Sequence, residues 1–252
     1  MHGEIPQIRL NRAMATAGIC SRRKADDLIR AGAVAVNGTV VLEPGLRVNP
    51  LSDTLSVNGR VVALRADEKT DQYCLLMLNK PVQVLSTVRD PQGRPCVLDY
   101  LPGKFREKRL YPVGRLDFFS EGLILLTDDG YLTHALTHPS RHIPRYYRLT
   151  VRESPTPAVL ARMRSGMTLS EGDTLLPAEA ELVGEHVVSL VLRQGVNRQI
   201  RRMCRDLGLT VLRLQRTGLG PLRLGDLPKG RCRPLSREEA TALRKAALHY
   251  SW

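Results

Sequence analysis

The sequence predicts an α+β protein with two domains. Two short helical segments and small alternating strands occupy residues 7–60, and a polar stretch rich in charges, VVALRADEKTDQ, follows them. Beyond it, strand-like and helix-like segments alternate irregularly with several hairpin signals, which favours an α+β fold over a repeating βαβ wind. We therefore expect a small domain over residues 7–60, a linker over 61–72 and a larger domain over 73–249.

The small domain is predicted to begin with two helices. Residues 9–18, RLNRAMATAG, carry apolar side chains at helical spacing and end at Gly18, a residue type at which helices often stop. Ser21 has the side chain of an N-cap for the segment SRRKADDLIRAG, which should end at Gly32. The sequence therefore indicates a pair of helices joined by a tight connection.

Three cations, Arg22, Arg23 and Lys24, fall in the first turn of the second predicted helix. A helix N-terminus favours anions, so cations at this position lower the local stability. Many charge runs are only a solvated polar face, but this local cost favours contact with phosphate groups. We expect these three side chains to bind a polyanion.

Short strands follow the helices. The segments AVAVNGTVV and LRVNPLSDTLSVNG alternate and are broken at Asn37-Gly38 and Asn58-Gly59, two dipeptides that form tight hairpin turns. Two helices and these strands make a unit of roughly 50 residues, which is near the minimum for independent folding.

The larger domain is predicted to open with a buried strand, YCLLMLNKP, that ends at Pro81. A second apolar run, Leu123 to Leu126, follows the stretch GRLDFFSEG, which contains Asp117. A carboxylate beside a buried strand is costly unless a partner satisfies it. Asp117 is therefore either a capping or turn residue or a group that is kept ionised for chemistry.

The charge balance indicates a polyanionic partner. The formal net charge is +13, and 31 of the 38 basic residues are Arg. The planar guanidinium fork grips phosphate groups in a bidentate manner, so nucleic acid is the favoured class of partner. A membrane surface is less suitable, because no segment sets its cations opposite a bulky apolar face.

Other classes of protein lack their expected signals. No apolar stretch approaches the ~20 residues that a membrane span requires, and the N-terminus has no signal-peptide core. The five cysteines are scattered and never spaced as Cys-x-x-Cys, which argues against disulfides and structural zinc. We expect a cytoplasmic protein that holds no metal.

A second dense motif, RQGVNRQIRRMCRDLGLTVLRLQR, covers residues 193–216, and from 193 to 233 the chain has eleven basic and two acidic residues. If the first part of this motif is an amphipathic helix, Arg201 falls between Ile200 and Met203, on or near its apolar face. A cation there needs an anionic partner, just as the lone carboxylate of Asp117 needs a cation.

Together these motifs resemble those of the pseudouridine synthases of the RsuA/RluB type, which modify ribosomal RNA. The family pattern of Gly-Arg-Leu-Asp, Ser/Thr-x-Gly-Leu and an Asp-Gly turn corresponds to GRLDFFSEGLILLTDDG at 114–130. The similarity continues through HPSRHIPRYYRLTV at 138–151, GVNRQIRRM at 195–203 and GLGPLRLGDLPKGRCRPLSREE at 218–239. The first seventy residues are similar to the small RNA-binding domain, first described in a small-subunit ribosomal protein, that precedes the catalytic domain in this family.

The resemblance implies a catalytic domain with a mixed, mainly antiparallel sheet flanked by helices. The reaction that it implies detaches uracil from C1′ of its ribose, rotates the base and rejoins it through C5, with no metal, cofactor or energy source. Asp117 would be the catalytic aspartate, and it must be ionised to act. The sequence leaves open whether this carboxylate attacks the sugar, attacks the base or removes a ribose proton.

Four further residues receive roles from the same motifs. Arg201 would pair with Asp117, Tyr147 would stack on the uracil and assist proton transfer, and Leu214 would wall the base pocket. Arg115 is a candidate to hold the opened RNA strand, although its side chain could equally serve the fold. On its pattern alone, Tyr147 is more typical of a strand residue in the core.

The expected partner is ribosomal RNA, free or within a pre-ribosomal particle, and the protein is expected to be a monomer. The side chains that we expect to contact RNA are Arg22, Arg23, Lys24, Arg198 and Arg202. The stretch DPQGRPCVLDYLP, residues 90–102, resembles family members that act on the large subunit, which favours 23S over 16S rRNA. Phe118 and Phe119 replace residues that are commonly polar, so they could alter how the flanking nucleotides are read.

Two other functional classes remain as alternatives. A catalytically silent rRNA-binding assembly factor on the same scaffold would be favoured by an altered Asp117, Tyr147 or Arg201, and all three are present. An RNA phosphodiesterase would need a metal cluster or a pair of histidines. His134, His138 and His142 recur every four residues, but Pro139 should break the helix that would align them on a metal.

Overall fold

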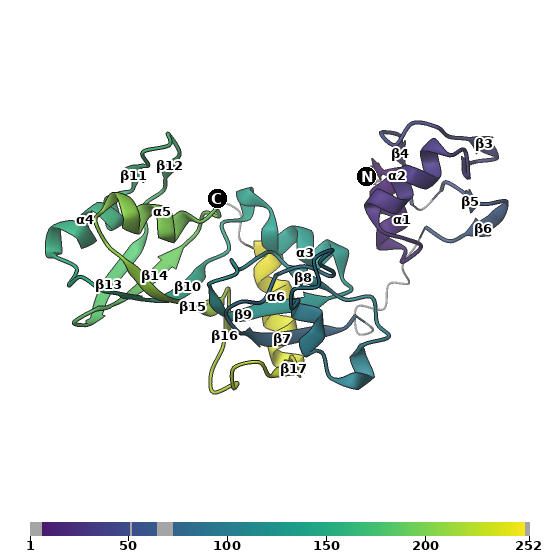
Figure 1. Cartoon of the computed structure of the whole chain (residues 1–252). Coiled ribbons are helices and arrows are strands. Elements are labelled where there is room, and N and C mark those ends of the chain that lie inside the picture. Colours follow the sequence, from purple (N-terminus) through teal and green to yellow (C-terminus); the bar gives the residue numbers. More distant parts are fainter. Residues whose placement is uncertain (1–6, 51, 65–72, 250–252) are drawn as a thin grey trace. The chain divides into compact units, whose positions relative to one another are not determined.

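The computed structural model describes residues 7–50, 52–64 and 73–249. The chain divides into two compact units, residues 1–73 and 74–252, each with its own sheet and core. Figure 1 shows the first unit in purple and blue and the second in teal to yellow. Helices and mainly antiparallel strands follow one another in irregular order, which confirms the predicted α+β class.

The N-terminal unit packs two helices on a small sheet. Its elements are β1 (Ile8–Arg9), α1 (Leu10–Thr16), α2 (Arg22–Arg30), β2 (Val34–Val36), β3 (Thr39–Val40), β4 (Arg47–Val48), β5 (Leu55–Val57) and β6 (Arg60–Val62). Within its described residues, four strands form an antiparallel sheet in the order β3-β2-β5-β6, and β1 pairs separately with β4. Leu10, Met14 and Ile29 of the helices share one buried core with Val34 and Leu55 of the sheet.

Local signals in this unit are confirmed. Ser21 caps α2, because its Oγ accepts a hydrogen bond from the backbone N–H of Lys24 at 3.2 Å. Both predicted hairpin turns are formed, with positive φ at Asn37 and Gly38 (51° and 81°) and at Asn58 and Gly59 (50° and 75°). Two consecutive left-handed residues are the geometry that joins two strands through a two-residue turn.

The N-terminal unit extends past residue 60, where the sequence prediction ended it. Val61 and Val62 lie in β6 and pair with β5, and Leu64 is buried in the core of this unit. The first residues of the predicted linker are therefore structured, because β6 pairs with β5 and Leu64 is buried. The remainder of that linker, 65–72, lies outside the described residues.

The C-terminal unit is built on a large mixed sheet. Its strands are β7 (Leu75–Lys80), β8 (Tyr111–Val113), β9 (Glu121–Thr127), β10 (Arg145–Val151), β13 (Glu179–Gly184), β14 (Val187–Leu192), β15 (Val211–Leu219), β16 (Leu222–Arg223) and β17 (Cys232–Pro234). Within the described residues the main path is β13-β14-β10-β15-β9-β7-β17, with β8 paired to β9 and β16 to β15. A separate hairpin is formed by β11 (Met167–Thr168) and β12 (Thr174–Leu175).

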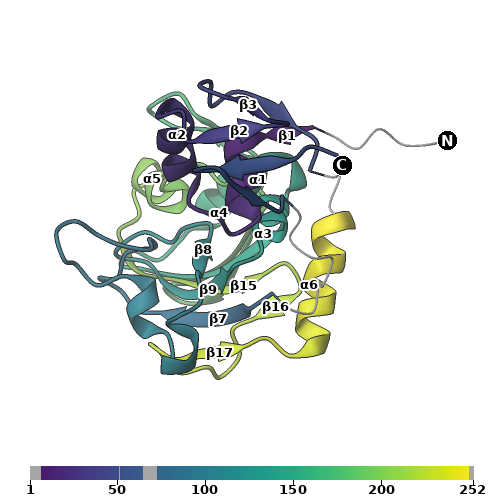
Figure 2. The same ribbon diagram turned by 90° about the vertical axis from the view of Figure 1, so that its right-hand side faces the viewer.

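Helices cover this sheet in two groups. The α-helices are α3 (Gly130–Thr137), α4 (Pro157–Ser165), α5 (Gln199–Asp206) and α6 (Arg237–His249), and the short 3-10 helices are η2 (Val97–Tyr100), η3 (Gly103–Phe105) and η4 (Pro139–Arg141). Helices α3 and α6 share a core with one face of β7 and β9, and η2 contributes to the core on the other face (Figure 2). Helices α4 and α5 share a separate core with β10, β13 and β14.

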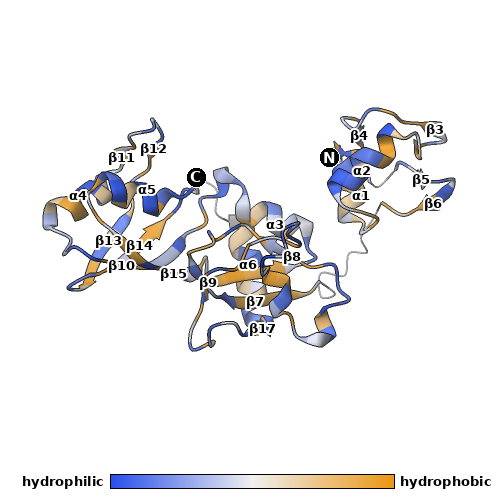
Figure 3. Cartoon of the chain, viewed as in Figure 1, coloured by the Kyte–Doolittle hydropathy of each residue, from blue (hydrophilic) through white to orange (hydrophobic). Residues whose placement is uncertain are grey.

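Strands β7 and β9 are buried along their whole length, so both are strongly apolar (Figure 3). The predicted strand YCLLMLNKP is thus confirmed as the buried strand β7, which ends before Pro81. Helix α3 likewise ends before Pro139, as the sequence predicted.

The two halves of the sheet meet where β9 runs parallel to β15, with Glu121 opposite Gln215 and Gly122 opposite Arg216. Gly122 has a φ of 103°, and a Cβ built on it would lie 2.2 Å from the backbone oxygen of Arg216. Only glycine allows the strands to approach so closely in this conformation. The junction positions the residues of the candidate site, which lie on both sides of it.

Candidate active site

A pocket of about 600 Å³ opens in the C-terminal unit, and its walls come from segments far apart in the sequence. The β8–β9 connection, β10, the segment 192–201 and β15 all contribute. The structure brings six predicted site residues together in its lining: Arg115, Asp117, Tyr147, Arg198, Arg201 and Leu214. This volume is in the range of pockets that enclose small-molecule ligands.

The turn that carries Asp117 is fixed by hydrogen bonds to its backbone on both sides of that residue. Ser86 Oγ donates to the carbonyl oxygen of Leu116 at 2.8 Å and accepts from the N–H of the same residue at 3.0 Å. The N–H of Gln83 donates to the carbonyl oxygen of Phe118 at 2.6 Å. Because these bonds hold the main chain, the Asp117 carboxylate is positioned without using its own oxygens.

Among the described residues, no side chain or backbone group donates a hydrogen bond or forms an ion pair with the Asp117 carboxylate. The residue is partly buried and lines the pocket. A carboxylate in such a position keeps its lone pairs available for a molecule that binds in the pocket.

Lys80 is a buried cation near Asp117 that the sequence interpretation missed, although it does not line the pocket. It ends β7, is 0% exposed, and its Nζ donates to the carbonyl oxygens of Pro81 and Val84, both at 2.8 Å. Burial lowers the pKa of Lys80 from 10.5 to about 8, and the nearby Asp117 charge partly offsets that effect. The only signal in the sequence is a cation at the end of an otherwise apolar strand.

The lowered pKa of Lys80 predicts how the free energy of unfolding changes with pH. The native state binds fewer protons than the unfolded chain between pH 8 and 10.5, so the free energy of unfolding should rise with pH in this window. From pH 7.5 to 9.5 we expect Lys80 to contribute a gain of about 2 kcal/mol. Urea titrations of wild type and Lys80→Met at both pH values measure it. Equal pH dependence in the two proteins would contradict the assignment.

The predicted ion pair between Arg201 and Asp117 is not formed within the described residues. Arg201 Nη2 instead donates to the carbonyl oxygen of Phe119 at 2.7 Å and lies 3.5 Å from Ser120 Oγ. Burial lowers the pKa of Arg201, while the Asp117 charge raises it. Arg201 thus acts on Asp117 through its electric field and by fixing the adjacent backbone, because its fork reaches the turn rather than the carboxylate.

Strands β10 and β15 both contribute to the pocket lining. In the antiparallel register, Tyr147 lies opposite Arg216 and Leu149 lies opposite Leu214. Since alternate residues of a strand share a face, Leu214 and Arg216 lie on the same face as Tyr147. Tyr147 is partly buried and packs against two core clusters, so its ring is part of the core and of the pocket wall together.

Arg198 and Arg202, both expected to contact RNA, have different environments. Arg198 is exposed, lines the pocket and has a left-handed backbone (φ 50°) just before α5. No described residue forms a hydrogen bond or ion pair with its side chain, so it is available to a ligand. Arg202, by contrast, points to intramolecular partners.

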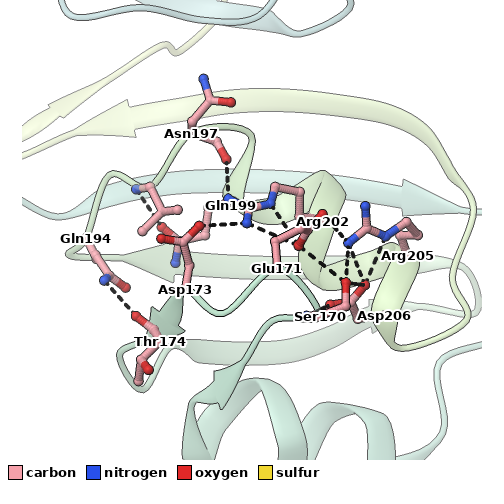
Figure 4. A network of polar contacts seen from close by, with 11 residues as sticks. Ser170, Glu171, Asp173, Thr174, Gln194, Asn197, Gln199, Arg202, Arg205 and Asp206 are labelled. Carbon is pink, nitrogen blue, oxygen red and sulfur yellow. Dashed lines mark hydrogen bonds and ion pairs between the residues drawn. The ribbon is translucent and has the colours of Figure 1, made fainter.

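Arg202 belongs to a network that ties α5 to the β11–β12 hairpin (Figure 4). Its Nη2 lies 2.6 Å from Asp173 and 3.1 Å from Glu171, and Arg205 also pairs with Glu171. These two arginines lower the pKa of Glu171 to about 2. The guanidinium of Arg202 is thus engaged in holding the helix that carries Arg201, and its expected contact with RNA stays a prediction.

The cationic cluster of the N-terminal unit is exposed. Arg22, Arg23 and Lys24 occupy the first turn of α2, and their side chains form no hydrogen bond or ion pair with any described residue. Figure 3 colours much of this helix blue, the colour of hydrophilic residues. The cluster is thus a separate surface within its own unit.

Comparison with known proteins assigns both units. Residues 74–206 match the family described as RNA pseudouridylate synthase, and residues 8–55 match the S4 domain. The chain belongs to the RNA pseudouridylate synthase family. The resemblance recognised in the sequence is confirmed, including the small domain that precedes the catalytic one.

Relatives within this family align with almost the whole chain. It is 38% identical over 247 residues to the ribosomal large subunit pseudouridine synthase B of Bacillus subtilis, covering 96% of this chain and 97% of the relative. It is 34% identical to the dual-specificity RNA pseudouridine synthase RluF of Escherichia coli, covering 94% of this chain and 79% of that protein. A crystal structure of a pseudouridylate synthase superposes with a TM-score of 0.67 at 27% identity, covering 94% of this chain and 99% of that one.

Two further observations concern a metal site and a membrane-spanning helix. In the described part of the chain, no group of three His, Cys, Asp or Glu side chains is arranged to hold a metal ion. Over the same residues, no helix is both long and apolar enough to cross a membrane.

Proposed function

We propose that the protein converts a specific uridine of large-subunit ribosomal RNA to pseudouridine, with Asp117 as the reacting carboxylate. The observation that carries this proposal is the Asp117 carboxylate, which faces a pocket without a partner of its own while its backbone is fixed on both sides. Tyr147, Leu214 and Arg201 border the same pocket. The name of the Bacillus subtilis relative, a ribosomal large subunit pseudouridine synthase, supports rRNA as the substrate, and 23S over 16S rRNA.

The reaction has requirements that these residues meet. The C1′–N1 bond breaks, the base rotates, a C5–C1′ bond forms, the C5 proton leaves and N1 takes up a proton, so atoms balance without an added reactant. Asp117 supplies the ionised carboxylate, whether toward the sugar, the base or a ribose proton. Tyr147 and Leu214 offer an aromatic and an apolar surface to a base that has left the RNA stack. No cofactor is needed, and we propose that the protein acts in the cytoplasm as a monomer.

Tritium release tests the proposed function. Purified protein is incubated with rRNA that carries [5-³H]uridine, and release of the C5 proton is followed for 23S and 16S transcripts separately. We expect release from 23S rRNA at a stoichiometry of one site or a few sites. Absence of release from both transcripts, with RNA binding intact, would favour a silent assembly factor instead.

The S4 domain is proposed to supply affinity rather than chemistry. Arg22, Arg23 and Lys24 form an exposed cluster, and each phosphate contact contributes about 0.7 to 0.9 to the slope of log affinity against log salt. Replacing all three by Ala should flatten this slope by up to about 2 to 3 and weaken RNA binding. Turnover at saturating RNA should stay within about twofold of wild type. An unchanged slope with a large fall in saturated turnover would place the cluster in the catalytic step.

A further inference from the structure

Arg216 is a guanidinium at the pocket that the motifs assign to no step. It lines the pocket yet is only 3% exposed. Its Nε donates to the carbonyl oxygen of Leu123 at 2.7 Å, whereas its Nη2 is buried and has no hydrogen-bond partner among the described residues. A buried, charged donor without an acceptor is energetically unfavourable, so this guanidinium favours a ligand that brings one.

The surroundings of Arg216 are rich in buried positive charge. Burial lowers the pKa of Arg145 and Arg201 in the pocket lining and of Lys80 nearby, since burial reduces the contact of each cation with water. Asp117 is the carboxylate in the pocket lining, and Glu121 nearby is already paired with Arg213 and Lys229. The pocket therefore favours an occupant that carries or develops negative charge.

The position of Arg216 relates it to the proposed base site. It follows Leu214 by two residues on β15, and in the sheet it lies opposite Tyr147. In the proposed function, Leu214 and Tyr147 are the two side chains that contact the target uracil. The guanidinium consequently borders the place where the polar edge of that base would lie.

We propose that Arg216 is a catalytic residue that donates a hydrogen bond to a carbonyl oxygen of the target uracil and stabilises the negative charge that the base acquires. The inference rests on the proposed function. In the two routes that begin at the ribose, the C1′–N1 bond breaks with its electron pair left on the base, where O2 and O4 share the charge. Arg216 keeps its proton throughout, and its donor is oriented beforehand because Nε is fixed on Leu123.

Substitution of Arg216 tests the size of the effect. Loss of one preorganised donor to a developing anion typically slows turnover by about 10²- to 10³-fold, so Arg216→Met should show a fall of this size in kcat. Arg216→Lys keeps a charge and should recover part of the rate. RNA affinity should stay within about threefold, because the base contact is a small part of an interface dominated by phosphates. Arg148→Met, an exposed arginine on β10, is the matched control and should retain the wild-type rate.

Sulfur substitution in the RNA separates a contact to the base from a structural role. The target uridine is replaced by 2-thiouridine or 4-thiouridine in a synthetic rRNA fragment, and the product nucleosides are separated by chromatography after digestion. Sulfur is a weaker acceptor, so one of the two should slow wild type by about tenfold or more. The same substitution should change the rate of Arg216→Met by less than twofold, because its donor is already gone.

The outcomes are distinct. A wild type that reacts with both thio substrates as fast as with uridine overturns the inference, whether or not Arg216→Met folds. An Arg216→Met variant that melts like wild type and keeps the full thio effect also overturns it. Failure of the wild type to form pseudouridine on unmodified rRNA would instead refute the proposed function itself.

Discussion

Asp117→Asn is expected to lower the rate of tritium release from rRNA by more than about 10⁴-fold, the scale of losing an essential reacting group. The substitution removes the charge but keeps the shape, and the turn is held by Ser86 and Gln83 rather than by the carboxylate. The RNA dissociation constant should therefore stay within about threefold of wild type, because the phosphate contacts that dominate RNA affinity are untouched. The measurements are tritium release and filter binding on the same preparation.

The matched control for Asp117 is Asp226, an exposed aspartate of the same unit whose side chain has no partner among the described residues. Asp226→Asn should release tritium at the wild-type rate. If Asp117→Asn released tritium as fast as Asp226→Asn, the reacting group would have to lie elsewhere in the pocket.

Arg201→Met is expected to lower kcat by about 10²- to 10³-fold, because it removes both a positive field at Asp117 and a bond to its turn. The bond from Nη2 to the Phe119 carbonyl oxygen is charge-assisted, and losing it should lower the free energy of unfolding by about 1.5 to 3 kcal/mol. Removing a partly buried charge also removes its desolvation cost, which offsets part of this loss. Arg201 has such a desolvation cost in the native protein, since burial lowers its pKa. The net change in the free energy of unfolding should therefore be smaller than that range.

Arg205→Met provides the control on the same helix. Arg205 is exposed and pairs with Glu171 and Asp206, and surface pairs of this kind contribute about 0 to 1 kcal/mol. Its turnover should remain within about twofold of wild type. An Arg201→Met enzyme with the turnover of Arg205→Met would show that Arg201 has no influence on Asp117.

Features governed by neighbouring residues were predictable from the sequence. Ser21 caps its helix through a contact three residues away, and the Asn-Gly turns depend on their own backbone conformation. The gathering of Asp117, Tyr147, Arg201 and Leu214 in one pocket was also anticipated, but through family motifs rather than through periodicity. The strand-like alternation of its segment predicted only that Tyr147 is a core residue. In the structure Tyr147 packs against the core and also lines the pocket.

Features that depend on distant packing were not predictable. The deep burial of Lys80 follows from the place of β7 between β9 and β17, with both faces covered by elements from other parts of the chain. Arg202 meets Glu171 and Asp173 only because a hairpin about thirty residues earlier in the chain folds against α5. The same limit applies to Arg201, because a helical pattern does not tell which atoms of the facing turn its guanidinium will reach.

The most direct test of the proposed function is a map of pseudouridines in cellular rRNA by carbodiimide modification and primer extension. Cells that lack the gene are compared with the same cells carrying wild-type protein or Asp117→Asn. We expect a carbodiimide-dependent stop in 23S rRNA to disappear without the gene, to return with the wild type and to stay absent with Asp117→Asn. An unchanged pattern of stops after deletion, or a stop restored by Asp117→Asn, would contradict the proposal that this pocket isomerises an rRNA uridine.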